Sequence, residues 1–151
     1  MNPKIWLSSP HLTGEEQKYV KEAFDTNWVA PLGPNVNGLE DDICKYSNVK
    51  SCSALTSGTA AIHLALIMLG VEKDDEVLVP SSTFHASIGP IINLNFVPKF
   101  VDIDKETLTI DCKDLENKIN ENTKALIIVH PWGYPCNMDK ILEIVQKYDL
   151  K

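Results

Sequence analysis

A short turn at residues 57–59 has residue types that could bind a phosphate group. Ser57, Gly58 and Thr59 follow a predicted strand and open an apolar helix that continues through Leu64. The first N–H groups of a helix have no partner inside it and lie at the positive end of the helix dipole, so they attract anions. Gly58 lets a ligand approach the backbone closely, and the two hydroxyls add donors. The plainer interpretation is that Ser57 or Thr59 only caps the helix.

Aromatic and imidazole side chains follow two further predicted strands. Phe84 comes shortly after one of them, and His130, Trp132 and Tyr134 come directly after another. Ligands bind at the carboxyl edge of open α/β sheets, so we expect both segments to lie near residues 57–59 at that edge. Phe84 could stack on a flat cofactor ring. The plainer interpretations are a Phe84 packed on the core at a helix start, and a turn shaped by proline and glycine whose aromatics cover the loop.

Alternating strand and helix patterns from residue 51 onward position these side chains. The predicted strands lie near 51–56, 76–80, 97–102 and 124–129, and the predicted helices near 59–69, 85–94, 111–119 and 138–148. The strand at 124–129 is a continuous apolar run, typical of a sheet covered on both faces, and the helix at 59–69 is apolar nearly all round, which predicts its burial. A further strand is expected to begin near Leu150. This alternation predicts an α/β fold of three layers, α-β-α, around a mostly parallel sheet.

The first 50 residues have a different pattern. Residues 1–12 are predicted to be an extended arm, and Thr13 with Glu16 forms a capping-box pattern that predicts a helix to about Asp25. Residues 27–38 are rich in proline, glycine and asparagine and are predicted to form a loop. A second helix is predicted from three apolar residues at helical spacing, Leu39, Ile43 and Tyr46.

The composition is that of an ordinary globular protein, with 44% hydrophobic and 23% charged residues. A formal net charge of −7 and scattered lysines argue against nucleic-acid binding, which needs a basic face. The longest apolar stretch, from Ala60 to Val71, is shorter than the roughly 20 residues of a membrane span. The N-terminus also lacks a secretory pattern. We therefore expect a soluble, cytoplasmic protein that binds neither nucleic acid nor membrane.

The cysteines and histidines show no metal-ligand spacing. No two of the four cysteines, Cys44, Cys52, Cys112 and Cys136, form a C-x-x-C pair. We therefore expect reduced thiols and no metal site.

Taken in order, these segments resemble the DegT-type sugar aminotransferases, a family of pyridoxal 5'-phosphate (PLP) enzymes with the aspartate-aminotransferase fold. Five blocks carry the resemblance: residues 28–34 with Glu40; 56–64; 74–84; 101–104 with 107–111; and 123–130 with Gly133, Met138, Asp139 and Ile141. They cover almost the whole chain, and their order and spacing make the match specific. Within the family, they are most similar to enzymes that aminate a UDP- or dTDP-linked 4-keto sugar for surface polysaccharide or glycoprotein glycan synthesis.

The resemblance implies roles for two groups of residues. Gly58, Thr59 and Ala60 are expected to hold the cofactor phosphate through backbone N–H groups and the Thr59 hydroxyl. Phe84 is expected to stack on the pyridine ring. Four loop residues are expected to bind the sugar substrate of a neighbouring subunit in a homodimer: Trp28, Val29, Pro31 and Gly33. Glutamate is the expected amino donor, and His130 receives no firm role.

Two catalytic groups of the family are not among the 151 residues. In the family, the strand after Leu150 carries an aspartate that pairs with the pyridine nitrogen, and a later lysine forms the Schiff base. The resemblance thus implies a truncated, N-terminal part that contains no catalytic residue and is inactive alone. Residues 1–50 would form the arm, helix and substrate loop, and residues 51–151 the first part of the PLP-binding large domain. In this fold the strand at 51–56 pairs with later sequence, and without it the strand would lack partners.

Three alternatives are compatible with the sequence. Some relatives use PLP to dehydrate a deoxysugar, with histidine in place of the lysine, and that position is not in the sequence. A non-catalytic α/β scaffold or binding protein would need a repaired sheet, because exposed strand edges favour aggregation. A nucleotide-binding domain is disfavoured, because neither G-x-x-x-x-G-K-[ST] nor G-x-G-x-x-G is present.

Overall fold

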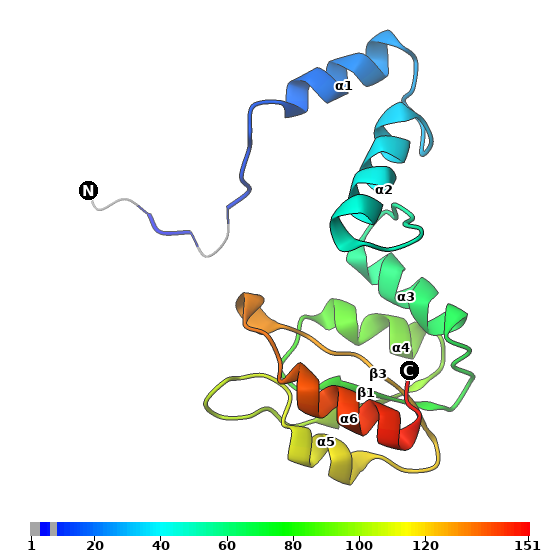
Figure 1. Ribbon diagram of the computed structural model, residues 1–151, viewed down its shortest axis with the longest axis vertical. Helices are drawn as coiled ribbons and strands as arrows, with labels where there is room; N and C mark the ends of the chain where they lie inside the picture. Colours follow the sequence, from blue (N-terminus) through cyan, green and yellow to red (C-terminus); the bar gives the residue numbers. More distant parts are fainter. Residues whose placement is uncertain (1–3, 7–8) are drawn as a thin grey trace. The chain divides into compact units, whose positions relative to one another are not determined.

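The structure, a computed structural model, describes residues 4–6 and 9–151 (Figure 1). The predicted arm at 1–12 falls partly outside the described residues, and its described part contains no helix or strand. The chain divides into two compact units, Met1–Ala54 and Leu55–Lys151, and each is described by itself. Among the described residues, no helix has the length and apolar character needed to cross a membrane.

The first unit contains two helices, α1 (Glu16–Asp25) and α2 (Pro34–Ser47). The Glu16 carboxylate accepts hydrogen bonds from the N–H groups of Thr13 (2.6 Å) and Gly14 (2.9 Å), so half of the predicted capping box is present. The Thr13 hydroxyl donates to the same carboxylate (3.0 Å) instead of capping the helix. Helix α2 begins earlier than its apolar pattern indicated, because Pro34 at its start is preorganised for helix and needs no N–H partner there.

The second unit is built on three parallel strands, β1 (Glu76–Pro80), β2 (Val97–Val101) and β3 (Thr123–Leu126), in the order β2-β1-β3. The central strand β1 is rich in β-branched and apolar residues, and Val77, Leu78 and Val79 are fully buried. Strand β3 ends at Leu126 and not at 129, although the Ile127 N–H still donates to the Leu78 carbonyl (2.8 Å).

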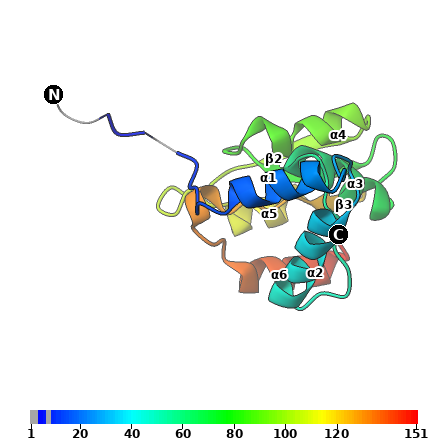
Figure 2. The same cartoon turned by 90° about the horizontal axis from the view of Figure 1, so that it is seen from above.

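Helices cover both faces of this sheet. Helix α3 (Gly58–Met68), the short 3-10 helix η1 (His85–Ser87) and α4 (Gly89–Asn93) lie on one face, with α5 (Cys112–Lys118) and α6 (Met138–Tyr148) on the other (Figure 1). In both views α4 and α6 lie on opposite sides of the strands (Figure 2). Side chains of β1 alternate between the two layers, Val77 and Val79 packing with Leu66 and Leu78 with Ile141. The predicted three-layer α/β fold is therefore confirmed.

The two outer edges of the sheet differ. At β3, the Lys151 N–H donates to the Lys124 carbonyl (3.0 Å) and the Leu126 N–H donates to the Lys151 carbonyl (2.9 Å), a parallel pairing that agrees with a strand beginning near 150. At β2, Pro98 lies opposite Val77, and the Lys118 ammonium donates to the Phe100 carbonyl (2.8 Å).

Three expectations about the elements are wrong. Residues 51–56 form no strand, because no described strand pairs with them, and an unpaired strand leaves its backbone groups unsatisfied. Helix α3 is not buried all round: only Leu66 is buried and Met68 is 77% exposed, since only one side of the helix packs on the sheet. The helix predicted at 85–94 is divided into η1 and α4, because Pro90 has no N–H to continue the preceding turn.

Candidate functional site

The turn before α3 has the geometry of a helix cap that leaves two backbone donors free. Ser57 is extended, and its hydroxyl accepts a hydrogen bond from the Ala60 N–H (3.1 Å), so the capping interpretation is right for this serine. Within the described part of the chain, the N–H groups of Gly58 and Thr59 have no acceptor. Both residues are exposed, and the space where a Gly58 side chain would lie is open. An anion can therefore reach two N–H groups and the Thr59 hydroxyl at the positive end of an 11-residue helix.

The Ala60 N–H differs from its two neighbours. It is already used by Ser57, so a phosphate oxygen can bond to it only by sharing or displacing the serine hydroxyl. Helix α3 packs against η1 and α4 and begins at the end of the unit where β1 leads into η1 (Figure 1). The turn thus lies towards the carboxyl edge of the sheet, where the sequence predicted it.

A second feature of this edge is a cavity of about 390 Å³ lined by Thr83, Phe84, His130 and Trp132, among others. Phe84 precedes η1 in an extended conformation and is 81% exposed, so the interpretation that it packs on the core is wrong. The structure therefore brings together the two aromatic segments that follow β1 and β3, whereas Gly58, Thr59 and Ala60 do not line this cavity.

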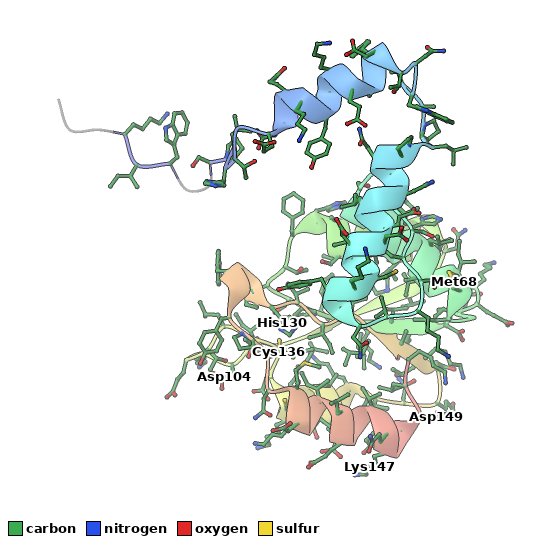
Figure 3. The ribbon with its side chains drawn as sticks, turned by 45° about the horizontal axis from the view of Figure 1, so that its top comes forward. Met68, Asp104, His130, Cys136, Lys147 and Asp149 are labelled. Atoms are coloured by element: carbon green, nitrogen blue, oxygen red, sulfur yellow. The ribbon has the colours of Figure 1, made fainter. Side chains whose placement is uncertain are left out.

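Local hydrogen bonds fix the walls of the cavity. The hydroxyls of Thr83 and Ser87 bond to each other (2.9 Å), which fixes the turn that presents Phe84. On the other wall, His130 Nδ1 accepts a hydrogen bond from the Cys136 N–H (3.0 Å) (Figure 3). The buried Cys136 thiol donates to the Val129 carbonyl (3.1 Å). This structural role of Cys136 could not be predicted, because nothing in the residue types pairs Cys136 with His130.

The predicted substrate loop lies in the first unit and is held by Trp28 and Gly33. Gly33 is buried with φ +130°, and a side chain there would come within 3.0 Å of Trp28 Cε3, so only glycine fits beneath the indole. Trp28 and Gly33 line a cavity of about 200 Å³. Val29 and Pro31 are exposed and do not line it.

A cavity of about 460 Å³ lies on the α5–α6 side and includes Asp104, Cys112 and Lys140 in its lining. It contains none of the residues predicted to bind cofactor or substrate. Beside Ile110 and Tyr134 its lining contains the charged side chains of Asp104, Asp111, Lys113 and Lys140, whereas a site for an aromatic cofactor ring has mainly apolar or aromatic walls. The cavity beside Phe84 is therefore the better candidate.

An exposed aromatic ring and an open helix N-terminus at one edge of a parallel sheet define a class of α/β proteins that bind a flat, phosphorylated cofactor. Residues 10–151 match the family described as the DegT/DnrJ/EryC1/StrS aminotransferase family, and the chain belongs to this family. PLP is the cofactor of the family, as the resemblance implied.

Relatives of known name support this assignment. GDP-perosamine synthase from Escherichia coli O157:H7 is 38% identical over 97% of this chain and 40% of its own length. The aminotransferase from Psychrobacter cryohalolentis has a TM-score of 0.85 at 30% identity, covering 93% of this chain and 36% of that structure. GDP-4-keto-6-deoxy-D-mannose-3-dehydratase from Escherichia coli was solved with bound hydrated PLP. It has a TM-score of 0.86 at 29% identity, and the match covers 95% of this chain and 38% of that structure. The chain thus spans about 40% of the length of the relatives it matches.

Proposed function

We propose that this chain is the N-terminal part of a PLP-dependent aminotransferase that acts on a keto sugar nucleotide in surface polysaccharide or glycoprotein glycan synthesis. Residues 1–50 would supply the arm and substrate loop, and residues 51–151 the first part of the cofactor-binding domain. The observation that carries the proposal is the free pair of N–H groups at Gly58 and Thr59 together with the exposed ring of Phe84, in a chain of this family.

The residues present fit the cofactor. Gly58 and Thr59 would hold its phosphate through backbone N–H groups and the Thr59 hydroxyl, with Ala60 contributing if Ser57 releases its N–H. Phe84 would cover one face of the pyridine ring and exclude water from it. When bound, PLP supplies an electron sink that stabilises negative charge on the substrate carbon. We assign the pairing aspartate and the Schiff-base lysine of the family to sequence that follows residue 151, so the 151 residues alone would not transaminate.

In the first unit, Trp28, Val29, Pro31 and Gly33 would bind the sugar nucleotide. The Trp28 indole, fixed on Gly33, offers an apolar face, while the exposed Val29 and Pro31 are free to contact a ligand. We expect the enzyme to be a cytoplasmic homodimer that takes its amino group from glutamate. The nucleotide is UDP, dTDP or, by analogy with the GDP-perosamine synthases, GDP.

Cofactor binding tests the proposal directly. Pyridoxamine 5'-phosphate is the suitable probe, because it has no aldehyde and cannot react with surface lysines. We expect saturable binding by equilibrium dialysis, weakened about tenfold by Phe84→Ala and about fivefold by Thr59→Ala. Phe100→Ala is the matched control, because Phe100 is a half-exposed phenylalanine on β2 that does not line the cavity. No saturable binding, or equal losses in all three variants, would contradict the proposal.

One specific observation supports a second candidate, a PLP-dependent deoxysugar dehydratase: the solved structures similar to this chain include such a dehydratase. The residue at the lysine position separates the two. Sequencing the DNA beyond codon 151 should reveal an aspartate on the next strand and later a lysine for the aminotransferase or a histidine for the dehydratase. A stop codon followed by unrelated sequence would contradict both and favour a non-catalytic remnant.

A further inference from the structure

His130 is held in one orientation and in one tautomer. Its Nδ1 accepts the Cys136 N–H (3.0 Å), and Cys136 is itself buried and bonded through its thiol to the Val129 carbonyl (3.1 Å). A ring nitrogen that accepts a hydrogen bond carries no hydrogen, so this geometry places the ring hydrogen on Nε2. His130 and Cys136 are neighbours in Figure 3. The bond to Cys136 therefore leaves an oriented N–H donor on His130, which lines the cavity beside Phe84.

Trp132 lines the same cavity in an unusual backbone conformation. Its φ of 51° and ψ of 24° lie in the left-handed region, where a bulky side chain is an outlier. The indole is 78% exposed, so burial in the core does not compensate for this strain. Backbone strain of this kind is concentrated at ligand sites, where the surrounding structure maintains it. Here it presents a large flat apolar surface at the cavity.

The lining of the cavity indicates the chemistry of its ligand. Apart from His130, its lining residues are aromatic, aliphatic or hydroxyl-bearing, and none of them is acidic or basic. Such a wall does not attract a phosphate or a carboxylate. It suits a neutral ligand with a C–H face for the indole and oxygen atoms for hydroxyl and imidazole donors. A sugar ring has both.

We infer that His130 and Trp132 recognise the sugar of the nucleotide sugar, the indole covering one face of the ring and His130 Nε2–H donating to a sugar oxygen. The inference rests on the proposed function, because Phe84 is assigned there to the cofactor ring. It adds to that function a second substrate-binding wall, contributed by the segment after β3 and separate from the loop at Trp28.

Two substitutions at His130 separate a binding role from a structural one. In His130→Asn the amide oxygen can still accept the Cys136 N–H, but no donor remains at the position of Nε2. In His130→Gln the amide nitrogen lies near the position of Nε2. Protein saturated with pyridoxamine 5'-phosphate is titrated calorimetrically with UDP-, dTDP- and GDP-linked 4-keto-6-deoxyhexoses and with the three bare nucleotides. For the sugar nucleotide that binds, we expect His130→Asn to weaken affinity about fivefold to tenfold and His130→Gln to restore most of it.

The controls of this experiment decide between the roles. Affinity for the bare nucleotide and the thermal midpoint should be unchanged in His130→Asn, because the bond to Cys136 is kept. Wild-type affinity of His130→Asn for the sugar nucleotide would overturn the inference. A parallel loss of thermal midpoint and of binding in both variants would overturn it too, by showing that His130 only supports the fold.

Tryptophan fluorescence tests the indole separately. The test uses a Trp28→Phe background, because Trp28 is the other indole assigned to the sugar nucleotide. In that background the sugar nucleotide should change the emission with Trp6 or with Trp6→Phe, a matched variant outside the cavity. It should not change the emission after Trp132→Ala, which should also bind about tenfold more weakly. Failure of pyridoxamine 5'-phosphate to bind would contradict the proposed function itself. Cofactor binding together with sugar-nucleotide binding that does not depend on His130 or Trp132 would overturn this inference alone. Cofactor binding without any sugar-nucleotide binding would overturn both this inference and the proposed substrate.

Discussion

The two units of the chain are stabilised in different ways. In Leu55–Lys151, apolar side chains are buried on both faces of a sheet, and Leu78, Leu115 and Ile141 are fully buried. In the first unit, neither α1 nor α2, both within the described part of the chain, contains a buried residue. Order there depends on contacts between near neighbours in sequence, such as Glu16 with Thr13. The unit assigned to the cofactor thus has a core of its own, whereas the two helices of the unit assigned to the substrate bury no residue.

The largest loss of stability is expected from a substitution in the core of the second unit. Ile141→Ala removes a fully buried side chain beneath α6 and should lower the free energy of unfolding by about 3 kcal/mol. Leu142→Ala, on the same helix at a half-exposed position, should cost less than about 1 kcal/mol, as should Ile43→Ala in α2. Urea denaturation followed by circular dichroism measures all three. A cost for Ile43→Ala equal to that of Ile141→Ala would show that the first unit has a core after all.

Glu76 stabilises the second unit through polar interactions, in contrast to the apolar packing of Ile141. Its carboxylate accepts hydrogen bonds from Lys99 (2.8 Å), Asn120 (2.9 Å) and Thr123 (3.2 Å), which ties the starts of all three strands together. Glu76→Gln should therefore cost about 2 kcal/mol, since hydrogen bonds to charged groups are strong. Asp42→Asn, which removes an exposed pair with Lys45, should cost almost nothing.

The same carboxylate predicts a dependence of stability on pH. Burial alone would raise the pKa of Glu76. The opposing effects are larger: the hydrogen bond and positive charge of Lys99 and the hydrogen bonds from Asn120 and Thr123 lower the pKa. The pKa of Glu76 therefore lies below its ordinary value of 4.5. A carboxyl with a depressed pKa in the folded state contributes its full stabilisation above pH 4.5 and loses it as the pH falls through the folded pKa. Acid unfolding of Glu76→Gln should lack this contribution; identical pH profiles of variant and wild type would contradict the assignment.

In the first unit, the contact between Gly33 and Trp28 is expected to hold the loop before α2. In Gly33→Ala the new side chain would be strained by the positive φ and would collide with the Trp28 ring. The substitution should therefore lower the free energy of unfolding by about 1 to 2 kcal/mol. It should also displace the indole, which would be visible as a shift in Trp28 emission. Gly38→Ala is the matched control, because Gly38 lies inside α2 with open space around it, and alanine should favour the helix there. Equal behaviour of the two variants would mean that the loop is not held by the Trp28–Gly33 contact.

The smallest effect is expected at Glu16. Bonds from the backbone N–H groups of Thr13 and Gly14 and from the Thr13 hydroxyl lower the pKa of Glu16 to about 2. The carboxylate should therefore stabilise the start of α1 above about pH 4.5, and this support should be lost as the pH falls towards 2. Chemical shifts of the first turn of α1 would follow the change, and Glu16→Gln should abolish it. Because Glu16 is exposed, the second unit should not respond.

The periodicity of the sequence predicted much of the second unit, because each strand and helix there contributes an apolar face to a shared core. It failed at residues 51–56, which form no strand because no described strand lies beside them to pair with. It also failed for α3, since composition cannot tell which sides of an apolar helix are covered. At the candidate site, residue types indicated Phe84 as an aromatic at the carboxyl edge. They could not indicate the bond between His130 and Cys136 or the backbone conformation of Trp132, which arise from the folding of a loop.

The edge of the sheet at β2 has a consequence for the behaviour of the protein in solution. Outward-facing backbone groups of an edge strand invite a strand from another molecule, the first step of amyloid-like growth. In β2 the backbone at Pro98 offers no N–H, and the outward carbonyl of Phe100 already accepts the Lys118 ammonium. An incoming strand would therefore lack a donor at Pro98 and would have to displace the Lys118 ammonium to reach the Phe100 carbonyl. These two features make the edge of the sheet at β2 a poor template for a strand of another molecule and so disfavour aggregation there.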